Sequence, residues 1–289
     1  MNISRLAVVG LGLIGGSLAR ALRAADAVGT IRGFDTDPRM RHLAVELGVV
    51  DEAAENAADA VRGADVVVLA VPVLHTAAAL AACLPGLGEG AVVTDVGSTK
   101  QSVLAAATEV FGRVPPRFVA GHPIAGTEKS GVAHALADLF HNRRVVLTPH
   151  PRQDAGALAS VSALWSAAGA RVVRMDPAEH DAVFAATSHL PHVLAYSFVD
   201  MLARLDERDE IFPNAGGGFR DFTRIASSSP EMWHDIVRAN ADSVARLLER
   251  QIGELGEVLA MIRAGRWDRL KALFERARAA RERHLAQIE

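Results

Sequence analysis

Two polar residues follow apolar runs at places where ordinary packing does not require them. His122 comes directly after RFVAG (117–121), and Ser98 comes directly after AVVTDVG (91–97). An imidazole titrates near neutrality and can accept a proton from a substrate. We therefore interpret His122 as a catalytic base, with a histidine that merely caps a loop as the alternative. Ser98 is a second polar residue at a strand end. It could also be an N-cap of the helix expected to start near Lys100, and both roles could hold.

A glycine-rich turn, GLGLIG, lies between the first apolar run and the first helical pattern. Its glycines permit a tight turn, close approach of a pyrophosphate and close helix–strand packing. Asp35 follows Gly15 by 20 residues, where a carboxylate would bind both ribose hydroxyls and repel a 2′-phosphate. The sequence therefore predicts NAD rather than NADP. The expected cofactor-binding residues are Gly10, Gly12, Leu13, Ile14, Gly15, Asp35 and the apolar strand end Ala70, Val71 and Pro72.

Short apolar runs alternate with helical patterns in the first part of the chain. Most of these runs are continuously apolar, as in strands covered on both faces. This rhythm predicts an α/β fold with a Rossmann-type, doubly wound, mostly parallel sheet, in which ligands bind beyond the carboxyl ends of the strands. The expected strands are 5–10, 30–35, 64–72, 91–97, 117–123, 144–149 and 170–175.

The pattern changes near residue 175, after which no strand is expected. Helical patterns run from Asp176-Pro177 to about residue 205, from about 230 to 262, and from about 267 onward, with a polar, glycine-rich break at 212–230. We expect a dinucleotide-binding domain at 1–174 and an all-helical substrate and dimerisation domain at 175–289. Amphipathic helices with wide apolar faces need a partner surface, so we expect a homodimer.

Composition excludes several classes of function. The net charge of −3 favours neither nucleic acid nor an anionic membrane as a partner, and no apolar run is long enough to span a membrane. Cys83 is the only cysteine among the 289 residues, which is typical of a reducing cytoplasm. His189 and His192 share a helical turn but lack a third ligand, so no metal is expected.

Four further motifs follow the glycine-rich turn in order: DVGSTK, GHPIAGTEKSG, SHLPH and GGGFRDFTRIA. Together they resemble the prephenate dehydrogenase family, with its arogenate and cyclohexadienyl relatives, over nearly the whole chain. The resemblance implies NAD-dependent oxidative decarboxylation of prephenate to 4-hydroxyphenylpyruvate, with CO2 release, in tyrosine biosynthesis. That chemistry needs an acceptor for the ring-hydroxyl proton and cations for two carboxylates.

The resemblance also implies roles for individual residues. His122 would take the hydroxyl proton, and Ser98 would hydrogen-bond both His122 and the substrate hydroxyl. Arg224 would bind the ring carboxylate. The other expected substrate-binding residues are His192, His189 and Ser188 in the helical domain and Thr127 and Glu128 at the pocket entrance.

Alternative functions stay open at this stage. Arogenate differs from prephenate only by an amino group in place of the side-chain keto group, and the sequence does not decide between the two. A dinucleotide-binding regulator without catalysis would keep the glycines but would not need His122, Ser98 and Arg224. A hydroxyacid dehydrogenase would more naturally carry a lysine where Ser188, His189 and His192 stand.

Overall fold

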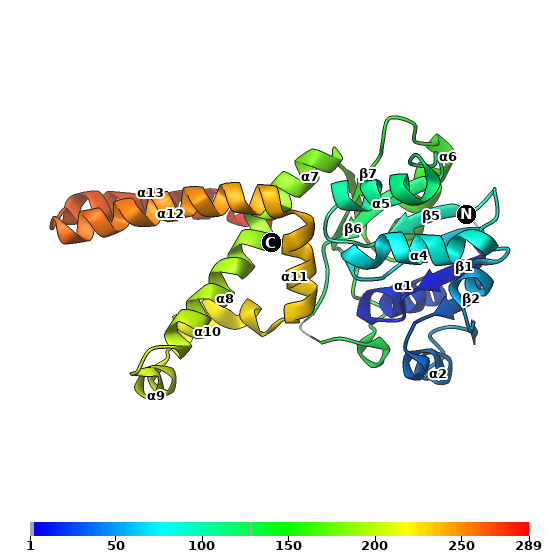
Figure 1. The fold of residues 1–289 in the computed structure, drawn as a ribbon, viewed down its shortest axis with the longest axis horizontal. Coiled ribbons are helices and arrows are strands. Elements are labelled where there is room, and N and C mark those ends of the chain that lie inside the picture. Colours follow the sequence, from blue (N-terminus) through cyan, green and yellow to red (C-terminus); the bar gives the residue numbers. More distant parts are fainter. Residues whose placement is uncertain (1–2, 128, 289) are drawn as a thin grey trace. The chain divides into compact units, whose positions relative to one another are not determined.

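The computed structural model describes residues 3–127 and 129–288, and it divides into two compact units (Figure 1). The first unit ends at Ala241 and the second begins at Asp242. The predicted domain boundary at 174/175 is a different division, which follows the change from strands to helices.

An eight-stranded sheet with the order β3-β2-β1-β4-β5-β6-β7-β8 forms the centre of the first unit. All neighbouring strands are parallel except β6 and β7. The carboxyl ends of β1, β4, β5 and β6 therefore lie along one edge of the sheet. The strands are β1 (Ile3–Val9), β2 (Val28–Phe34), β3 (Glu52–Ala53), β4 (Val66–Leu69), β5 (Val92–Asp95), β6 (Phe118–Pro123), β7 (Arg144–Thr148) and β8 (Arg171–Arg174).

Helices bury apolar side chains on both faces of this sheet. Leu18 and Leu22 of α1 and Trp165 of α6 belong to the cluster on one face, while Leu80 and Val103 belong to the cluster on the other. This arrangement confirms the predicted doubly wound α/β fold. The helices are α1 (Leu13–Ala24), α2 (Pro38–Glu46), α3 (Ala57–Val61), α4 (Thr76–Cys83), α5 (Gln101–Phe111) and α6 (Ala155–Ala167).

The single antiparallel pair has a simple cause. Parallel neighbours need a crossover, usually a helix, whereas the segment between β6 and β7 holds only a 3₁₀ turn, Val132–His134, among its described residues. The chain therefore returns in the opposite direction. The short strand β3, which the sequence analysis missed, has only two residues and too little pattern to be recognised.

The rest of the described chain is helical and contains no strand. It comprises α7 (Pro177–Phe184), a π-helical turn (Ala185–His189), α8 (Leu190–Ala203), α9 (Arg208–Ile211), a 3₁₀ turn (Phe212–Asn214), α10 (Gly217–Thr223), a second 3₁₀ turn (Arg224–Ser227), α11 (Pro230–Ala239), α12 (Ala241–Arg263) and α13 (Trp267–Ile288). Two expectations are corrected here. The glycine-rich break contains α10, whose Phe219 and Phe222 rings pack against Phe198 of α8. The pattern from 230 to 262 divides at Asn240, which leaves the helix and hydrogen-bonds through its side chain.

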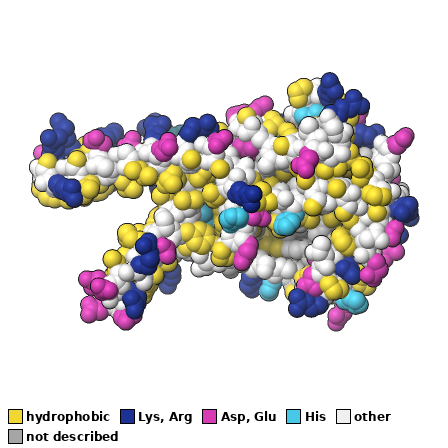
Figure 2. All heavy atoms as spheres, viewed as in Figure 1, with side chains coloured by type: hydrophobic (Ala, Val, Ile, Leu, Met, Phe, Trp, Pro, Cys, Tyr) yellow, Lys and Arg dark blue, Asp and Glu magenta, His cyan; other side chains and the backbone are white. Residues whose placement is uncertain are grey.

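The second unit contains α12 from Asp242 onward and α13, joined at Gly265, which has a φ of +62°. Val244 is the only buried residue described in this unit. Four apolar side chains are exposed at helical spacing along α12: Ile252, Leu255, Leu259 and Ile262. Hydrophobic side chains are visible at the surface of this helix in Figure 2. Across the described residues, no helix has both the length and the apolarity to cross a membrane.

Candidate active site

The glycine-rich turn leaves no room for side chains at two of its positions. Gly10 has a φ of +100°, and a Cβ there would lie 2.3 Å from the carbonyl oxygen of Ala70. A Cβ on Gly15 would lie 2.2 Å from the carbonyl oxygen of Gly10. Gly12, by contrast, faces open space at the start of α1, and no side chain caps that helix. Uncapped N–H groups beside an open glycine suit a pyrophosphate, so these residues fit a dinucleotide.

Asp35 follows β2 and is partly exposed. One carboxylate oxygen accepts a hydrogen bond from the backbone N–H of Leu11 at 2.8 Å, and the other accepts from that of Asp37 at 2.9 Å. Asp35 therefore holds the glycine-rich turn in place while presenting its charge beside it. Each oxygen keeps a lone pair for a ribose hydroxyl. The nearby cations are engaged elsewhere, since Arg32 pairs with Glu52 and Arg39 pairs with Asp37.

Replacing Asp35 by serine is expected to narrow the preference for NAD over NADP. The substitution removes the negative charge that would repel a 2′-phosphate. It also removes acceptors for two backbone N–H groups, so both cofactors should bind less well, and the ratio of the two kcat/KM values is the informative measurement. Glu46→Ser is the matched control, because Glu46 is an exposed carboxylate at the end of α2 that forms no ion pair with a described cation. A wild-type protein that uses NADP as efficiently as NAD would contradict this role.

His122 is the penultimate residue of β6 and is half-buried. Its Nδ1 lies 2.8 Å from Nε2 of His180, and the ring also contacts Phe184 at a centroid distance of 4.9 Å. Burial, followed by the charges of His180, Lys100 and His189, lowers the pKa of His122 well below its usual range. The imidazole is therefore neutral near pH 7 and able to accept a proton.

A buried ion pair fixes the backbone just before His122. The Lys100 ammonium donates to Asp95 Oδ2 and to the carbonyl oxygen of Gly121, both at 2.6 Å. The other oxygen of Asp95 accepts from the N–H of Gly121 at 3.0 Å. Because both polar groups of Gly121 are held from β5 and the start of α5, the position of His122 at the sheet edge is fixed.

Ser98 lies half-buried after β5, at the same edge. Its side chain hydrogen-bonds no other residue in the described part of the chain, so the hydrogen bond from Ser98 to His122 that the resemblance implied is not formed here. Nδ1 of His122 hydrogen-bonds with His180 instead. The alternative of Ser98 as a helix cap is wrong. The first free N–H groups of α5, those of Lys100 and Gln101, donate instead to the carboxylate of Asp181, at 2.7 and 2.9 Å.

The SHLPH segment forms the π-helical turn and the start of α8. Pro191 lacks an N–H, and its ring would clash with the carbonyl of residue 187 in a regular helix, which the wider turn avoids. His192 is half-buried, and its ring stacks on Trp233 of α11 at 3.4 Å. Burial is the main cause that lowers the pKa of His192, and the guanidinium of Arg224 adds to it.

Ser188 and His189 occupy different environments in this turn. Ser188 is half-buried, and its carbonyl oxygen lies 2.9 Å from Nδ1 of His192. His189 is 1% exposed, with Nδ1 3.2 Å from the side-chain nitrogen of Asn240. Burial lowers the pKa of His189 to about 4. His189 therefore lies beneath the surface, as a core-facing histidine would.

The remaining expected substrate ligands are Arg224, which follows α10, and Thr127 and Glu128, which follow β6 in the sequence. Arg224 is exposed at the start of the 3₁₀ turn after α10 and forms no ion pair with a described carboxylate. Thr127 is exposed, and its hydroxyl accepts from the N–H of Lys129 at 3.2 Å. Glu128 lies outside the described residues.

Comparison with known proteins decides the family. The nucleotide-binding domain model of prephenate dehydrogenase matches residues 18–174, and the dimerization domain model of the same family matches residues 176–276. The chain belongs to the prephenate dehydrogenase family. The resemblance found in the sequence is therefore confirmed.

Individual members of the prephenate dehydrogenase family match over most of their length. A cyclohexadienyl dehydrogenase of Zymomonas mobilis is 36% identical over 279 residues, which cover 96% of this chain and 94% of the relative. A prephenate dehydrogenase of Bacillus subtilis is 37% identical over 282 residues, covering 95% and 74%. The crystal structure of the prephenate dehydrogenase of Aquifex aeolicus, in complex with hydroxyphenyl propionate and NAD+, has a TM-score of 0.91 at 35% identity and covers 100% of this chain and 99% of that one. The chain is an NAD-dependent dehydrogenase of this family, as predicted.

The buried polar partners of the two histidines escaped the sequence analysis. His180, Asp181 and Asn240 are buried around His122 and His189. The adjacent His-Asp pair lies within the first two turns after the Asp176 N-cap, where charged residues usually face solvent. Only the packing of α7 against the start of α5 shows that this face is buried.

Proposed function

We propose that the chain oxidatively decarboxylates prephenate to 4-hydroxyphenylpyruvate in tyrosine biosynthesis, with His122 as the acceptor of the ring-hydroxyl proton. One observation carries this proposal. His122 lies near the end of β6, at the same sheet edge as the glycine-rich turn, its Nδ1 hydrogen-bonds with His180, and no described residue hydrogen-bonds its Nε2. A neutral imidazole with one free nitrogen at this edge suits a general base.

The chemistry divides among a few side chains. When bound, NAD takes up the hydride that leaves the carbinol carbon. His122 removes the hydroxyl proton, and Ser98 hydrogen-bonds the same hydroxyl. Loss of CO2 leaves the electron pair of the broken bond in the ring, which becomes aromatic, and the proton on His122 can return to the phenolate oxygen.

The proposed binding residues contact different ends of the substrate. Arg224 binds the ring carboxylate, because a guanidinium can donate two parallel hydrogen bonds. His192 contacts the side-chain end. Ser188 and His189 line the pocket or support its wall, and Thr127 and Glu128 shape its entrance. The close stacking of His192 on Trp233 supports this assignment, since it fixes the imidazole in one orientation.

Steady-state assays of the purified protein with prephenate and with arogenate, each with NAD and NADP, test the proposal. We expect the highest kcat/KM for prephenate with NAD, and 4-hydroxyphenylpyruvate as the product. If arogenate is the better substrate, the chain is an arogenate dehydrogenase rather than a prephenate dehydrogenase. If the protein turns over neither prephenate nor arogenate, both proposed activities are wrong. The chain would then be a cofactor-binding protein without this catalysis.

Arogenate use is the second candidate, and the likeness to a cyclohexadienyl dehydrogenase favours it. Arogenate would give tyrosine directly through the same proton and hydride chemistry. The difference lies only at the side-chain end, where an ammonium group would replace a keto group near His192. A lowered pKa keeps His192 neutral, so this residue does not repel an ammonium group.

We infer that the chain forms a homodimer through its helical part. The match to a dimerization domain and the exposed stripe Ile252, Leu255, Leu259 and Ile262 support this inference.

We also propose the functional boundary at 174/175, supported by the end of β8 at Arg174 and the start of α7 at Pro177. The buried free thiol of Cys83 supports a cytoplasmic location.

A further inference from the structure

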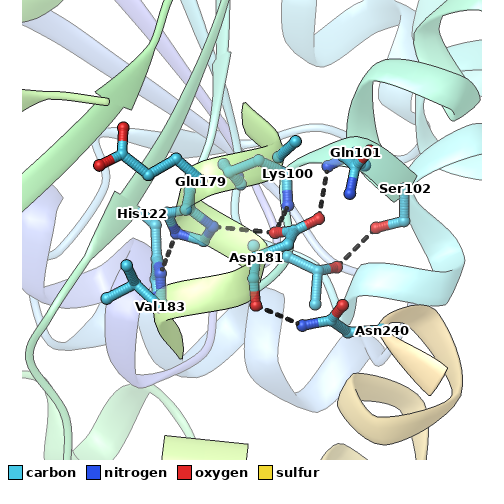
Figure 3. A network of polar contacts seen from close by, with 12 residues as sticks. Lys100, Gln101, Ser102, His122, Glu179, Asp181, Val183 and Asn240 are labelled. Atoms are coloured by element: carbon cyan, nitrogen blue, oxygen red, sulfur yellow. Dashed lines mark hydrogen bonds and ion pairs between the residues drawn. The ribbon is translucent and has the colours of Figure 1, made fainter. Parts of the chain in front are cut away.

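Asp181, His180 and His122 form a continuous chain of hydrogen bonds that ends at the proposed base (Figure 3). Oδ1 of Asp181 lies 2.9 Å from Nδ1 of His180, and Nε2 of His180 lies 2.8 Å from Nδ1 of His122. His180 has an exposed fraction of 0% and Asp181 of 1%. Water therefore does not compete for the hydrogen bonds of His180 and Asp181.

The carboxylate at the inner end of this chain is fixed as an acceptor. Its two oxygens accept from the backbone N–H groups of Lys100 and Gln101 at the start of α5. Burial raises the pKa of Asp181, but the hydrogen bonds from His180, Lys100 and Gln101 outweigh that effect and hold the pKa below its usual value. Asp181 is therefore ionised and can only accept.

An ionised Asp181 determines where each proton lies. Nδ1 of His180 must carry a hydrogen to donate to the carboxylate. Burial is the main cause that lowers the pKa of His180, so this imidazole is neutral and its Nε2 is an acceptor. Nδ1 of His122 must then donate to His180, and the lone pair of His122 lies on Nε2.

We propose that His180 and Asp181 are positioning residues that hold the proton of His122 on Nδ1 and so leave Nε2 as the basic nitrogen. This proposal rests on the proposed function, in which His122 is the base. When Nε2 takes the substrate proton, the ring becomes a cation. The hydrogen bond to His180, polarised by the negative charge of Asp181, then stabilises that cation.

Other charged groups around His122 do not replace this pair. Lys100, from the start of α5, is held by Asp95 of β5, and His189 of the π-helical turn is held by Asn240. Phe184 of α7 contributes only its ring. Glu179 of α7 is exposed, and its carboxylate points away from the network in Figure 3. Asp181 is thus the acid connected to His122 by hydrogen bonds through a single intervening ring.

The tautomer of His122 tests the proposal without any assay of activity. Protein labelled with ¹⁵N at histidine gives separate signals for the two ring nitrogens, and the signals of His122 are those lost in His122→Asn. We expect the wild-type protein to show a protonated Nδ1 and an unprotonated Nε2. A protonated Nε2 in the free wild-type protein would overturn the proposal, even if His122→Asn proves that His122 is the base.

The kinetic test uses His180→Gln and Asp181→Asn. We expect each to lower kcat about 10- to 100-fold, less than removal of the base itself, with KM for prephenate and the Kd of NAD within about twofold of wild type. Loss of the Asp181 charge destabilises the imidazolium form of His122 and lowers its pKa. The acidic limb of the kcat profile should therefore move to lower pH by about one unit in Asp181→Asn.

Asp235→Asn is the matched control, because His234 and Asp235 are also sequence neighbours with an Nδ1–Oδ1 distance of 3.0 Å, but His234 is exposed. This control should leave both kcat and the acidic limb unchanged. A purely structural role for Asp181 predicts a lower melting temperature and a lower kcat with the acidic limb unmoved, and that result would overturn the proposal. A kcat within twofold of wild type in both variants would do the same.

Discussion

Replacing His122 by asparagine is expected to lower kcat about 10²- to 10⁴-fold, the usual cost of removing a general base. Asparagine keeps a hydrogen-bonding side chain, which can still contact His180, but it cannot take the substrate proton. The lost interaction belongs mainly to the transition state, so KM for prephenate and the affinity for NAD should change little. Steady-state kinetics with a separate measurement of NAD binding distinguish these effects.

The pH profile adds a second expectation for His122. The base must be neutral, so activity falls as pH drops through its pKa. Burial lowers the pKa of His122 well below its usual range, so the acidic limb of kcat/KM should lie below about pH 6.5. A substrate carboxylate would stabilise the imidazolium form, so the limb of kcat should lie at higher pH than that of kcat/KM. If His122 causes them, the acidic limbs of kcat/KM and of kcat should both disappear in His122→Asn.

Retention of most of the turnover and of the same acidic limb in His122→Asn would show that another group is the base. His192 would then be the first residue to test, because it is half-buried and stands among the proposed substrate ligands. His189 is a poorer substitute, since it is buried, its Nδ1 is held by Asn240 and its pKa is about 4.

The cofactor half of the molecule could be predicted from local sequence rules. The turn GLGLIG requires glycine at Gly10 and Gly15 because carbonyl oxygens lie where their side chains would be. Continuous apolar runs mark strands covered on both faces, and the structure places β4, Val66–Leu69, entirely in the core. Both patterns involve residues that are close together in the sequence, so they can be recognised without the structure.

The polar network around His122 depends on contacts between distant parts of the chain. Asp181 caps a helix that starts 80 residues earlier, and Asn240 reaches back to the carbonyl oxygen of Asp181. Neither contact leaves a local pattern. The sequence therefore pointed to the histidine at the strand end but not to the residues that hold its proton in place.

Replacing Arg224 by glutamine is expected to raise KM for prephenate about 30-fold or more while leaving NAD affinity almost unchanged. Glutamine keeps some of the length and removes the charge. Loss of a charge-assisted pair costs on the order of 2–4 kcal/mol when the bound substrate shields it from water. The guanidinium is exposed in this chain, forms no ion pair with a described carboxylate, and helps to lower the pKa of His192. It is therefore free to meet an anionic ligand beside that histidine.

Arg220→Gln is the control for Arg224, because Arg220 is also exposed and lies only four residues earlier, in α10. Its removal changes the net charge equally and should leave KM for prephenate unchanged. The size of the effect at Arg224 decides its role. An exposed ion pair contributes about 0–1 kcal/mol, which corresponds to roughly a fivefold change or less. A change of that size would mean that the substrate carboxylate stays in water at Arg224 and that another cation binds it.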